Sequence, residues 1–225
     1  MKKKALAITI GLALLSAATA SLAEGNTQAG KAKSATCAGC HGEDGNSLAA
    51  MFPKLAGQHA SYTARQLKAF KDGTRNNPTM MPMAAALSDD DIADLSAYYA
   101  AQKIAPNENA PPTFEDDDET VNNVEETPEL STKELVALGR RLYETGNVDS
   151  GVSACIACHG PTGMGNKPAG FPVLKGQHAE YVYTALKEFQ AGARGGDFSK
   201  MMYMVAQKMT RQEMKAAAAY ISTIK

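Results

Sequence analysis

Hydrophobic positions recur at helical spacing along the chain, and no stretch shows the strict alternation of a β-strand. In the stretch 59–71 the large apolar residues lie at mixed helical spacing, and Gly73 is placed to end a helix there. A second stretch begins at Ser88, which resembles a capping box with Asp91 and precedes apolar residues at i, i+3 and i+7, namely Ile92, Leu95 and Tyr99. The pattern therefore predicts an all-α fold.

The pattern occurs twice. The segment 52–59, Phe-Pro-Lys-Leu-Ala-Gly-Gln-His, recurs 119 positions later at 171–178, and 66–70 is echoed at 185–189 with the same offset. Ser88 matches Thr210 at an offset of 122, and Thr210 forms a capping box with Glu213 before the apolar stripe Met214, Ala218, Ile221 and Ile224. We therefore expect two tandem copies of one small helical domain, 24–104 and 131–225.

An acidic segment separates the two copies. Residues 106–131 contain 9 acidic and 0 basic residues and few apolar ones. Such a segment repels itself and has little to bury, so we interpret 105–130 as a solvated linker. The alternative is that it docks across a basic surface of the second copy or of a partner.

The N-terminus has the three parts of a secretory signal peptide. Lys2, Lys3 and Lys4 precede an apolar run from Ala5 to Leu15, and small residues follow up to Ala23. The run is shorter than the roughly 20 residues of a membrane anchor. We therefore expect residues 1–23 to be a cleaved signal, with an uncleaved anchor as the alternative, and the mature protein to be exported without a membrane span.

The net charge of the chain excludes nucleic acid as an expected partner. The chain has 225 residues, 44% of them hydrophobic, and 23 Lys plus Arg balance 24 Asp plus Glu. A net charge of -1 gives no basic surface for nucleic acid. The charge is uneven, because 132–225 has 12 basic and 7 acidic residues, an excess of +5, whereas 24–105 has 8 of each.

The cysteines identify the cofactor. A Cys-x-x-Cys-His motif attaches c-type haem, because two thiols on one helical turn can form thioethers and the adjacent His then lies beneath the iron. A redox dithiol or half a zinc site would explain the cysteines alone, but not a His after both pairs. The two motifs use all four cysteines and predict two covalent haem c groups: Cys37, Cys40 and His41 in the first copy, and Cys155, Cys158 and His159 in the second.

The sequence offers several candidates for the sixth ligand of each iron. Each copy has a methionine cluster after polar loop residues, which favours a ligand loop over a core helix, and thioether sulfur opposite His raises the reduction potential. Methionines also fill gaps in cores. His59 and His178 are competing ligands, although their place at the start of a helix favours a surface role or one beside a haem propionate. The candidates are Met80, Met81 and Met83, and Met201, Met202 and Met204.

The paired Cys-x-x-Cys-His motifs, the Phe-Pro-x-Leu-x-Gly-Gln segments and the methionine clusters before Leu-Ser or Met-Thr together resemble the dihaem cytochrome c4 family of bacterial periplasms. The resemblance covers the mature chain except the linker, which is unusually long and acidic. It implies two cytochrome c-like domains facing each other about a pseudo-twofold axis. It places the methionine ligand eight residues before the Ser or Thr that opens the last helix, which gives Met80 and Met202.

The resemblance also implies the function. Family members carry electrons in the periplasm from a membrane quinol-oxidising complex to a terminal oxidase, without general acid, base or nucleophile. One alternative is an electron-transfer subunit of a periplasmic dehydrogenase. The other is a dihaem peroxidase, which needs an iron with an open position, whereas both copies here carry methionines. We expect an electron carrier and no enzyme.

Overall fold

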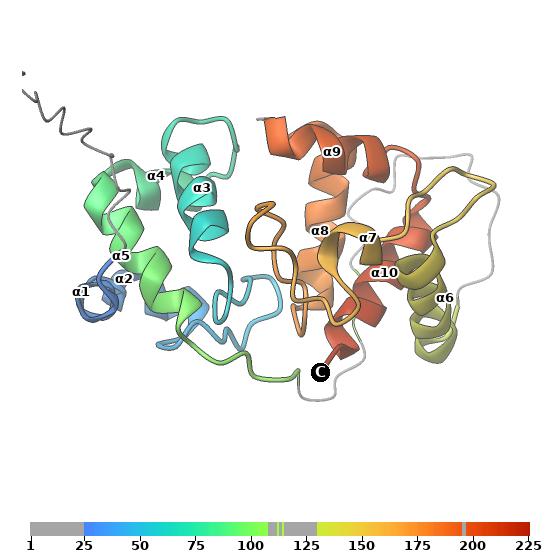
Figure 1. The fold of residues 1–225 in the computed structure, drawn as a ribbon, viewed down its shortest axis with the longest axis horizontal. Helices are drawn as coiled ribbons and strands as arrows, with labels where there is room; N and C mark the ends of the chain where they lie inside the picture. Colours follow the sequence, from blue (N-terminus) through green and yellow to red (C-terminus); the bar gives the residue numbers. More distant parts are fainter. Residues whose placement is uncertain (1–24, 108–111, 113, 115–129, 195–196) are drawn as a thin grey trace, which may run out of the picture.

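The structure is a computed structural model that describes residues 25–107, 112, 114, 130–194 and 197–225. That part of the chain folds as α-helices joined by loops, with isolated bridges in place of strands, so the all-α prediction is confirmed. The helices form two groups side by side (Figure 1). The predicted signal, 1–23, and most of the predicted linker lie outside the described residues, and no described helix is long and apolar enough to cross a bilayer.

The first group contains five helices within the described residues. Helix α1 packs on α5, α3 contacts both α4 and α5, and α2 follows α1 directly. The buried cluster is small, with Leu95, Tyr98 and Tyr99 at its centre. The helix bounds are α1 Thr27–Lys33, α2 Ala35–His41, α3 Ala60–Lys71, α4 Met80–Ala85 and α5 Asp89–Ala100.

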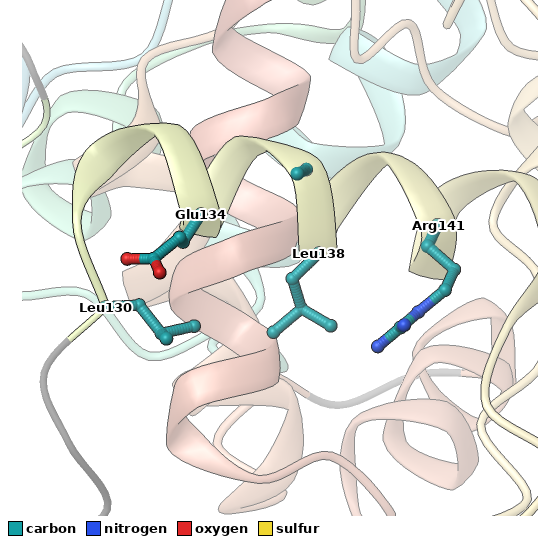
Figure 2. A pocket seen from close by; sticks show the side chains of 5 residues that line it. Leu130, Glu134, Leu138 and Arg141 are labelled. Atoms are coloured by element: carbon teal, nitrogen blue, oxygen red, sulfur yellow. The ribbon is translucent and has the colours of Figure 1, made fainter.

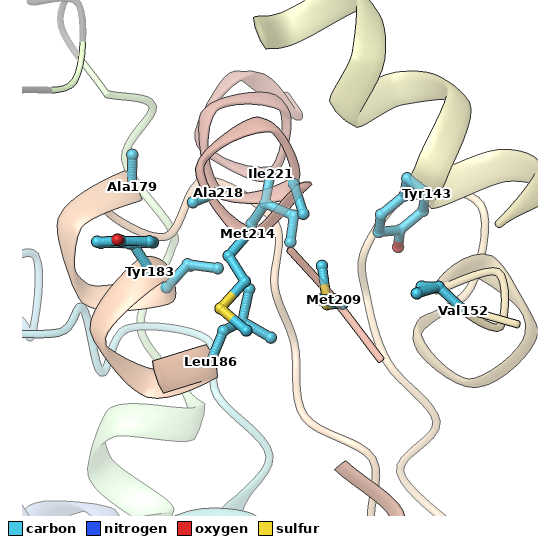
Figure 3. Close-up of a cluster of buried hydrophobic side chains, with 11 residues drawn as sticks. Tyr143, Val152, Ala179, Tyr183, Leu186, Met209, Met214, Ala218 and Ile221 are labelled. Carbon is cyan, nitrogen blue, oxygen red and sulfur yellow. The ribbon is translucent and has the colours of Figure 1, made fainter. Parts of the chain in front are cut away.

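The second group repeats this arrangement with a larger core. Helix α10 packs on α6 and α8, and α9 packs on α8. Figure 3 shows Met214 and Ile221 of α10 meeting Leu186 and Tyr183 of α8, with Tyr143 of α6 on the other side. The bounds are α6 Thr132–Thr145, α7 Ile156–His159, α8 Ala179–Gln190, α9 Asp197–Ala206 and α10 Arg211–Thr223.

Glycine lets the first and last helix of each group cross closely. A Cβ atom on Gly139 of α6 would lie 1.9 Å from the carbonyl oxygen of Ala216 in α10, and one on Gly30 of α1 would lie 2.0 Å from that of Asp94 in α5. Both contacts are with backbone, which cannot rotate away. The two helix pairs therefore use the same small-residue crossing.

Side-chain caps fix where the helices begin. The predicted capping boxes Ser88 with Asp91 and Thr210 with Glu213 are both present. A third, Ser131 with Glu134, opens α6 and was not predicted. Helix α3 ends at its C-cap Asp72, one residue before Gly73, whose φ of 78° breaks the helix as the sequence indicated.

Two glutamines join the groups through reciprocal hydrogen bonds. The amide of Gln58 accepts from the backbone N–H of Val173 at 2.9 Å and donates to the carbonyl of Val173 at 3.0 Å. Gln177 pairs in the same way with Lys54, at 2.8 and 2.9 Å. Because both glutamines come from the repeated Gly-Gln-His segment, the interface is a two-fold pairing of one surface with its copy.

The chain segment 103–107 crosses this interface. The Lys54 ammonium donates to the carbonyl of Ala105 at 2.7 Å, and the Asn107 amide donates to the carbonyls of Gly176, Gln177 and Ser222 at 3.0–3.2 Å. Phe114 packs against Tyr183, with ring centroids 5.2 Å apart. Asn107 and Phe114 of the predicted linker are therefore held against the second group.

Candidate functional site

Each Cys-x-x-Cys-His motif lies on a short helix that a glycine ends. Cys37 and Cys40 are three residues apart on α2 and His41 is its last residue, so the two thiols are neighbours on the helix surface. Cys155 is the N-cap of α7 and His159 is its last residue. Gly42 and Gly160 follow with φ of 79° and 75°. The two motifs thus have the same backbone setting.

Each motif histidine is buried and held through one ring nitrogen. The Nδ1 of His41 lies 2.8 Å from the carbonyl oxygen of Pro53, and that of His159 lies 3.0 Å from the carbonyl oxygen of Pro172. Burial lowers the pKa of both histidines and so favours neutral imidazole. A carbonyl partner for Nδ1 fixes the tautomer whose Nε2 has a free lone pair, which is how protein metal sites orient a ligating histidine.

The methionine clusters lie on helices, not in the predicted loops. Met80, Met81 and Met83 lie on α4, and Met201, Met202 and Met204 lie on α9. The preceding polar residues were interpreted as a loop that continues through the methionines, but the loop ends at Thr79, the N-cap of α4, and Asn77 accepts the N–H of Met80 at 2.9 Å.

Burial singles out Met202 in the second cluster but leaves two candidates in the first. Met202 is half-buried and packs against the core cluster that Cys155 and Ile156 also contact, whereas Met201 and Met204 are 39% and 56% exposed. In the first group Met80 and Met81 are both half-buried, and Met83 is 42% exposed. Met80 is the one that matches Met202 in the repeat.

The two competing histidines face the opposite group. The Nε2 of His178 lies 2.8 Å from the carbonyl oxygen of Ser47 and so carries the proton of that hydrogen bond. The neighbours of His59 are the backbone of Met164 and Lys167, and burial is the main cause that lowers its pKa. Both are half-buried between the groups, and their expected role, at the surface or beside a haem propionate, stays a prediction.

The described residues offer no competing metal site. Within them, no group of three or more His, Cys, Asp or Glu side chains gathers in a way that could hold a metal ion. A shallow groove on the outer face of α6 (Figure 2) is lined by Leu130, Glu134, Ala137, Leu138 and Arg141, and it contains none of the predicted site residues.

This donor set fits covalent haem in both halves. Each half offers two neighbouring thiols, a neutral histidine with one nitrogen fixed, and a half-buried thioether on a separate helix. Fold and site together define a c-type cytochrome with two haem c groups.

Comparison with known proteins shows to which family of c-type cytochromes the chain belongs. The cytochrome c family model matches residues 23–103 and again 136–225. Cytochrome c4 of Pseudomonas aeruginosa is 38% identical over 96% of this chain and 94% of its own length. A thiosulfate dehydrogenase electron acceptor of Stutzerimonas stutzeri is 36% identical over 94% of this chain and 91% of its own length. The crystal structure of reduced cytochrome c4 from Pseudomonas stutzeri superimposes with a TM-score of 0.75 at 36% identity, covering 89% of this chain and all of that one. The chain belongs to the dihaem cytochrome c4 family and is an electron carrier, not an enzyme.

Some residues at the centre of the molecule were missed from the sequence. Gln58 and Gln177 join the groups, and Arg75 and Arg194 are buried between them. Both pairs recur at the offset of 119 that defines the repeat. Polar residues repeated at that offset were the available signal.

Proposed function

We propose that the protein carries electrons in the periplasm from a membrane quinol-oxidising complex to a terminal oxidase. The cysteines of the two motifs attach the haems, His41 and Met80 bind the first iron, and His159 and Met202 bind the second. Each iron, when bound, takes up and releases one electron.

The observation that carries this proposal is the repetition of one donor set. Both histidines are buried with Nδ1 on a proline carbonyl, and in each group a separate helix carries a half-buried methionine. Two occupied axial positions leave no site for substrate, and His opposite Met suits a potential at which electrons are accepted and returned.

The protein residues keep the two centres in place while the charge changes. The carbonyl bonds hold both imidazoles in one tautomer, and the glutamine pairs hold the groups against each other. The second group adds an excess of basic residues, several of them exposed, which suits an acidic partner surface. The exposed basic residues include Lys133, Arg140, Arg141, Lys167, Lys200, Lys208 and Arg211.

Methionine ligation is tested one residue at a time. Met80→Leu and Met202→Leu each remove one thioether, so each variant should lose about half of the weak long-wavelength band of ferric haem with methionine on iron. The potential of one haem should fall as its sixth ligand is lost. Visible spectra during a redox titration of the holoprotein measure both quantities.

Neighbouring methionines provide matched controls. Met81→Leu, Met83→Leu, Met201→Leu and Met204→Leu should leave the band and both potentials unchanged. Loss of the band in one of these variants, with the band intact in Met80→Leu or Met202→Leu, would show that the ligand of that group is assigned wrongly.

A second candidate function is supported by relatives of this chain that serve thiosulfate dehydrogenase. The relative from Stutzerimonas stutzeri is named as an electron acceptor of thiosulfate dehydrogenase. In this alternative, the protein accepts electrons from a periplasmic dehydrogenase. Stopped-flow reduction of the ferric protein, by quinol-oxidising membranes in one series and by a purified thiosulfate dehydrogenase in another, distinguishes the two donors.

A further inference from the structure

Two equivalent arginines meet where the groups face each other. Arg75 follows α3 and Arg194 follows α8, and their backbones form an antiparallel bridge. Their side chains are only 7% and 4% exposed. Each guanidinium lies over a phenylalanine of its own group, Phe70 at 4.5 Å and Phe189 at 4.2 Å. Two cations are therefore buried side by side.

The polar partners of the two arginines are shared. Gln66 accepts one hydrogen bond from each guanidinium, both at 2.8 Å. Glu188 lies 3.4 Å from Nη2 of Arg75 and 3.9 Å from Nε of Arg194. Tyr181 and Tyr62 add hydroxyls at 3.4 and 3.3 Å. The cluster is one site built by both groups.

The described side chains do not balance the two positive charges of this site. Among the described side chains, the two guanidinium groups face a single carboxylate, so one of the two positive charges has no carboxylate partner there. The Nε atoms of Arg75 and Arg194 are both buried and have no hydrogen-bond partner among the described residues. Burying an unpaired charge and unpaired donors is costly, so the site is built for additional anionic oxygen atoms.

We propose that Arg75 and Arg194 form a shared cationic site that binds carboxylates of the haem propionates from both domains, and that Glu188 sets its net charge. The inference rests on the proposed function only in that both haems are present. Each arginine lies on the segment that leads to a methionine helix, five residues before Met80 or eight before Met202. A planar guanidinium matches a carboxylate in geometry as well as charge.

The arginines, their phenylalanines and the two tyrosines are equivalent in the repeat, whereas Glu188 and Gln66 have no equivalent. Glu188 corresponds to Ala69 in the repeat, and Gln66 corresponds to Ala185. Since Glu188 is the one carboxylate among the described side chains paired with these arginines, one side chain of the second domain adjusts the field that both haems experience. A negative charge near a haem stabilises ferric over ferrous iron and so lowers the potential.

Redox titration of the holoprotein tests this role. Glu188→Gln keeps the shape and removes the charge, so both potentials should rise, with the reduction equilibrium shifting about tenfold, or about 59 mV for a one-electron couple. Arg75→Gln and Arg194→Gln should lower both potentials, and Arg75→Lys should restore part of the loss. Glu144→Gln is the matched control, because Glu144 also pairs with an arginine, Arg140 at 2.9 Å, but on the surface.

Three results would overturn the inference. The first is a Glu188→Gln protein whose potentials equal those of the wild type and of Glu144→Gln. The second is an Arg75→Gln protein that folds by circular dichroism and shows unchanged potentials. The third is a wild-type potential that changes with inorganic phosphate at constant ionic strength while that of Arg75→Gln does not, which would assign the site to a free anion. The long-wavelength ferric band, recorded in every variant, reports separately on the methionine ligands of the proposed function.

Discussion

Asp91 connects two helices through one carboxylate. Its Oδ2 accepts the N–H of Ser88 at 2.9 Å and so caps α5, while its Oδ1 lies 2.7 Å from the ammonium of Lys33 on α1. Asp94 pairs with the same ammonium at 2.6 Å. The hydrogen bond from Lys33 and those from Ser88 hold the pKa of Asp91 well below its usual range.

The lowered pKa of Asp91 makes the stability of the folded protein depend on pH. The folded protein binds the proton of Asp91 less tightly than the unfolded chain, so the stabilisation is complete above the ordinary carboxyl pKa and is lost as the pH falls below it. Asp91→Asn should be less stable than the wild type at neutral pH, and the difference should shrink between about pH 5 and pH 2. Urea unfolding at several pH values measures it.

Asp90→Asn is the control for this comparison, because Asp90 is exposed on the same turn of α5. It removes one negative charge near the start of α5 and leaves the pairs of Lys33 with Asp91 and Asp94 in place. A stability gap of Asp91→Asn that stays constant down to pH 2 would contradict the role given to its charge.

Single residues differ in how far their roles could be predicted. The cysteines and motif histidines follow from spacing, because haem attachment needs that spacing and little else explains it. Arg75 and Arg194 gave no such signal. An arginine in a sequence is ordinarily a solvated charge, and its burial depends on a second surface that is brought to it only by folding.

At the scale of elements, the crossing of α6 over α10 depends on Gly139. Gly139→Ala adds a Cβ within 1.9 Å of a backbone oxygen, so the helices must separate. We expect a loss of about 1–3 kcal/mol from overpacking, although alanine favours the helix itself. Chemical denaturation of the ferric protein measures the free energy of unfolding.

Ala137→Ser is the matched control, since Ala137 is exposed two residues earlier on α6. It should change stability by less than about 0.5 kcal/mol. A Gly139→Ala protein as stable as this control would mean that the two helices are not held at the distance seen here.

The helices expected from the sequence were those whose apolar stripe or capping residues stood out; α1 and α6 were not among them, although Asn26 and Ser131 cap them. The stretches that become α3, α5 and α10 were expected from periodicity and capping residues. Helix α1, Thr-Gln-Ala-Gly-Lys-Ala-Lys, has no large apolar residue to mark it. Its stability comes from packing on α5, and α4 and α9 were assigned to loops because they directly follow polar loop residues.

At the scale of the molecule, the glutamine pairs hold the two domains together. Gln58→Ala with Gln177→Ala would leave buried backbone groups of Val173 and Lys54 without partners, at about 1–3 kcal/mol for each unmatched group. We expect the domains of the double variant to unfold in two transitions where the wild type shows one. Calorimetry of the holoprotein detects the split.

Gln102→Ala is a suitable control, because the Gln102 amide bonds to the carbonyl of Tyr98 within the first domain. It should leave a single transition. One transition in the double variant as well would show that segment 103–107 and the arginine site are enough to couple the domains.

The domain arrangement itself could not be predicted from composition or periodicity. The main hydrogen bonds between the domains join a side chain of one domain to backbone groups of the other, as Gln58 does with Val173. Every residue has such backbone groups, so the sequence does not show which of them will be the partners. The repeat predicted that two similar domains exist. Only the fold shows that the same segment of each faces the other.

The reciprocal glutamine contacts also affect how far the sequences of the two domains can come to differ from each other. A surface that pairs with its own copy could equally join two separate identical domains, where every contact would have to occur twice. In such a pair of first domains the two arginines would face no glutamate, and in a pair of second domains they would face two. Fusion into one polypeptide removes this constraint, since each half can then change alone. The single Glu188 is a difference that only a fused pair can keep.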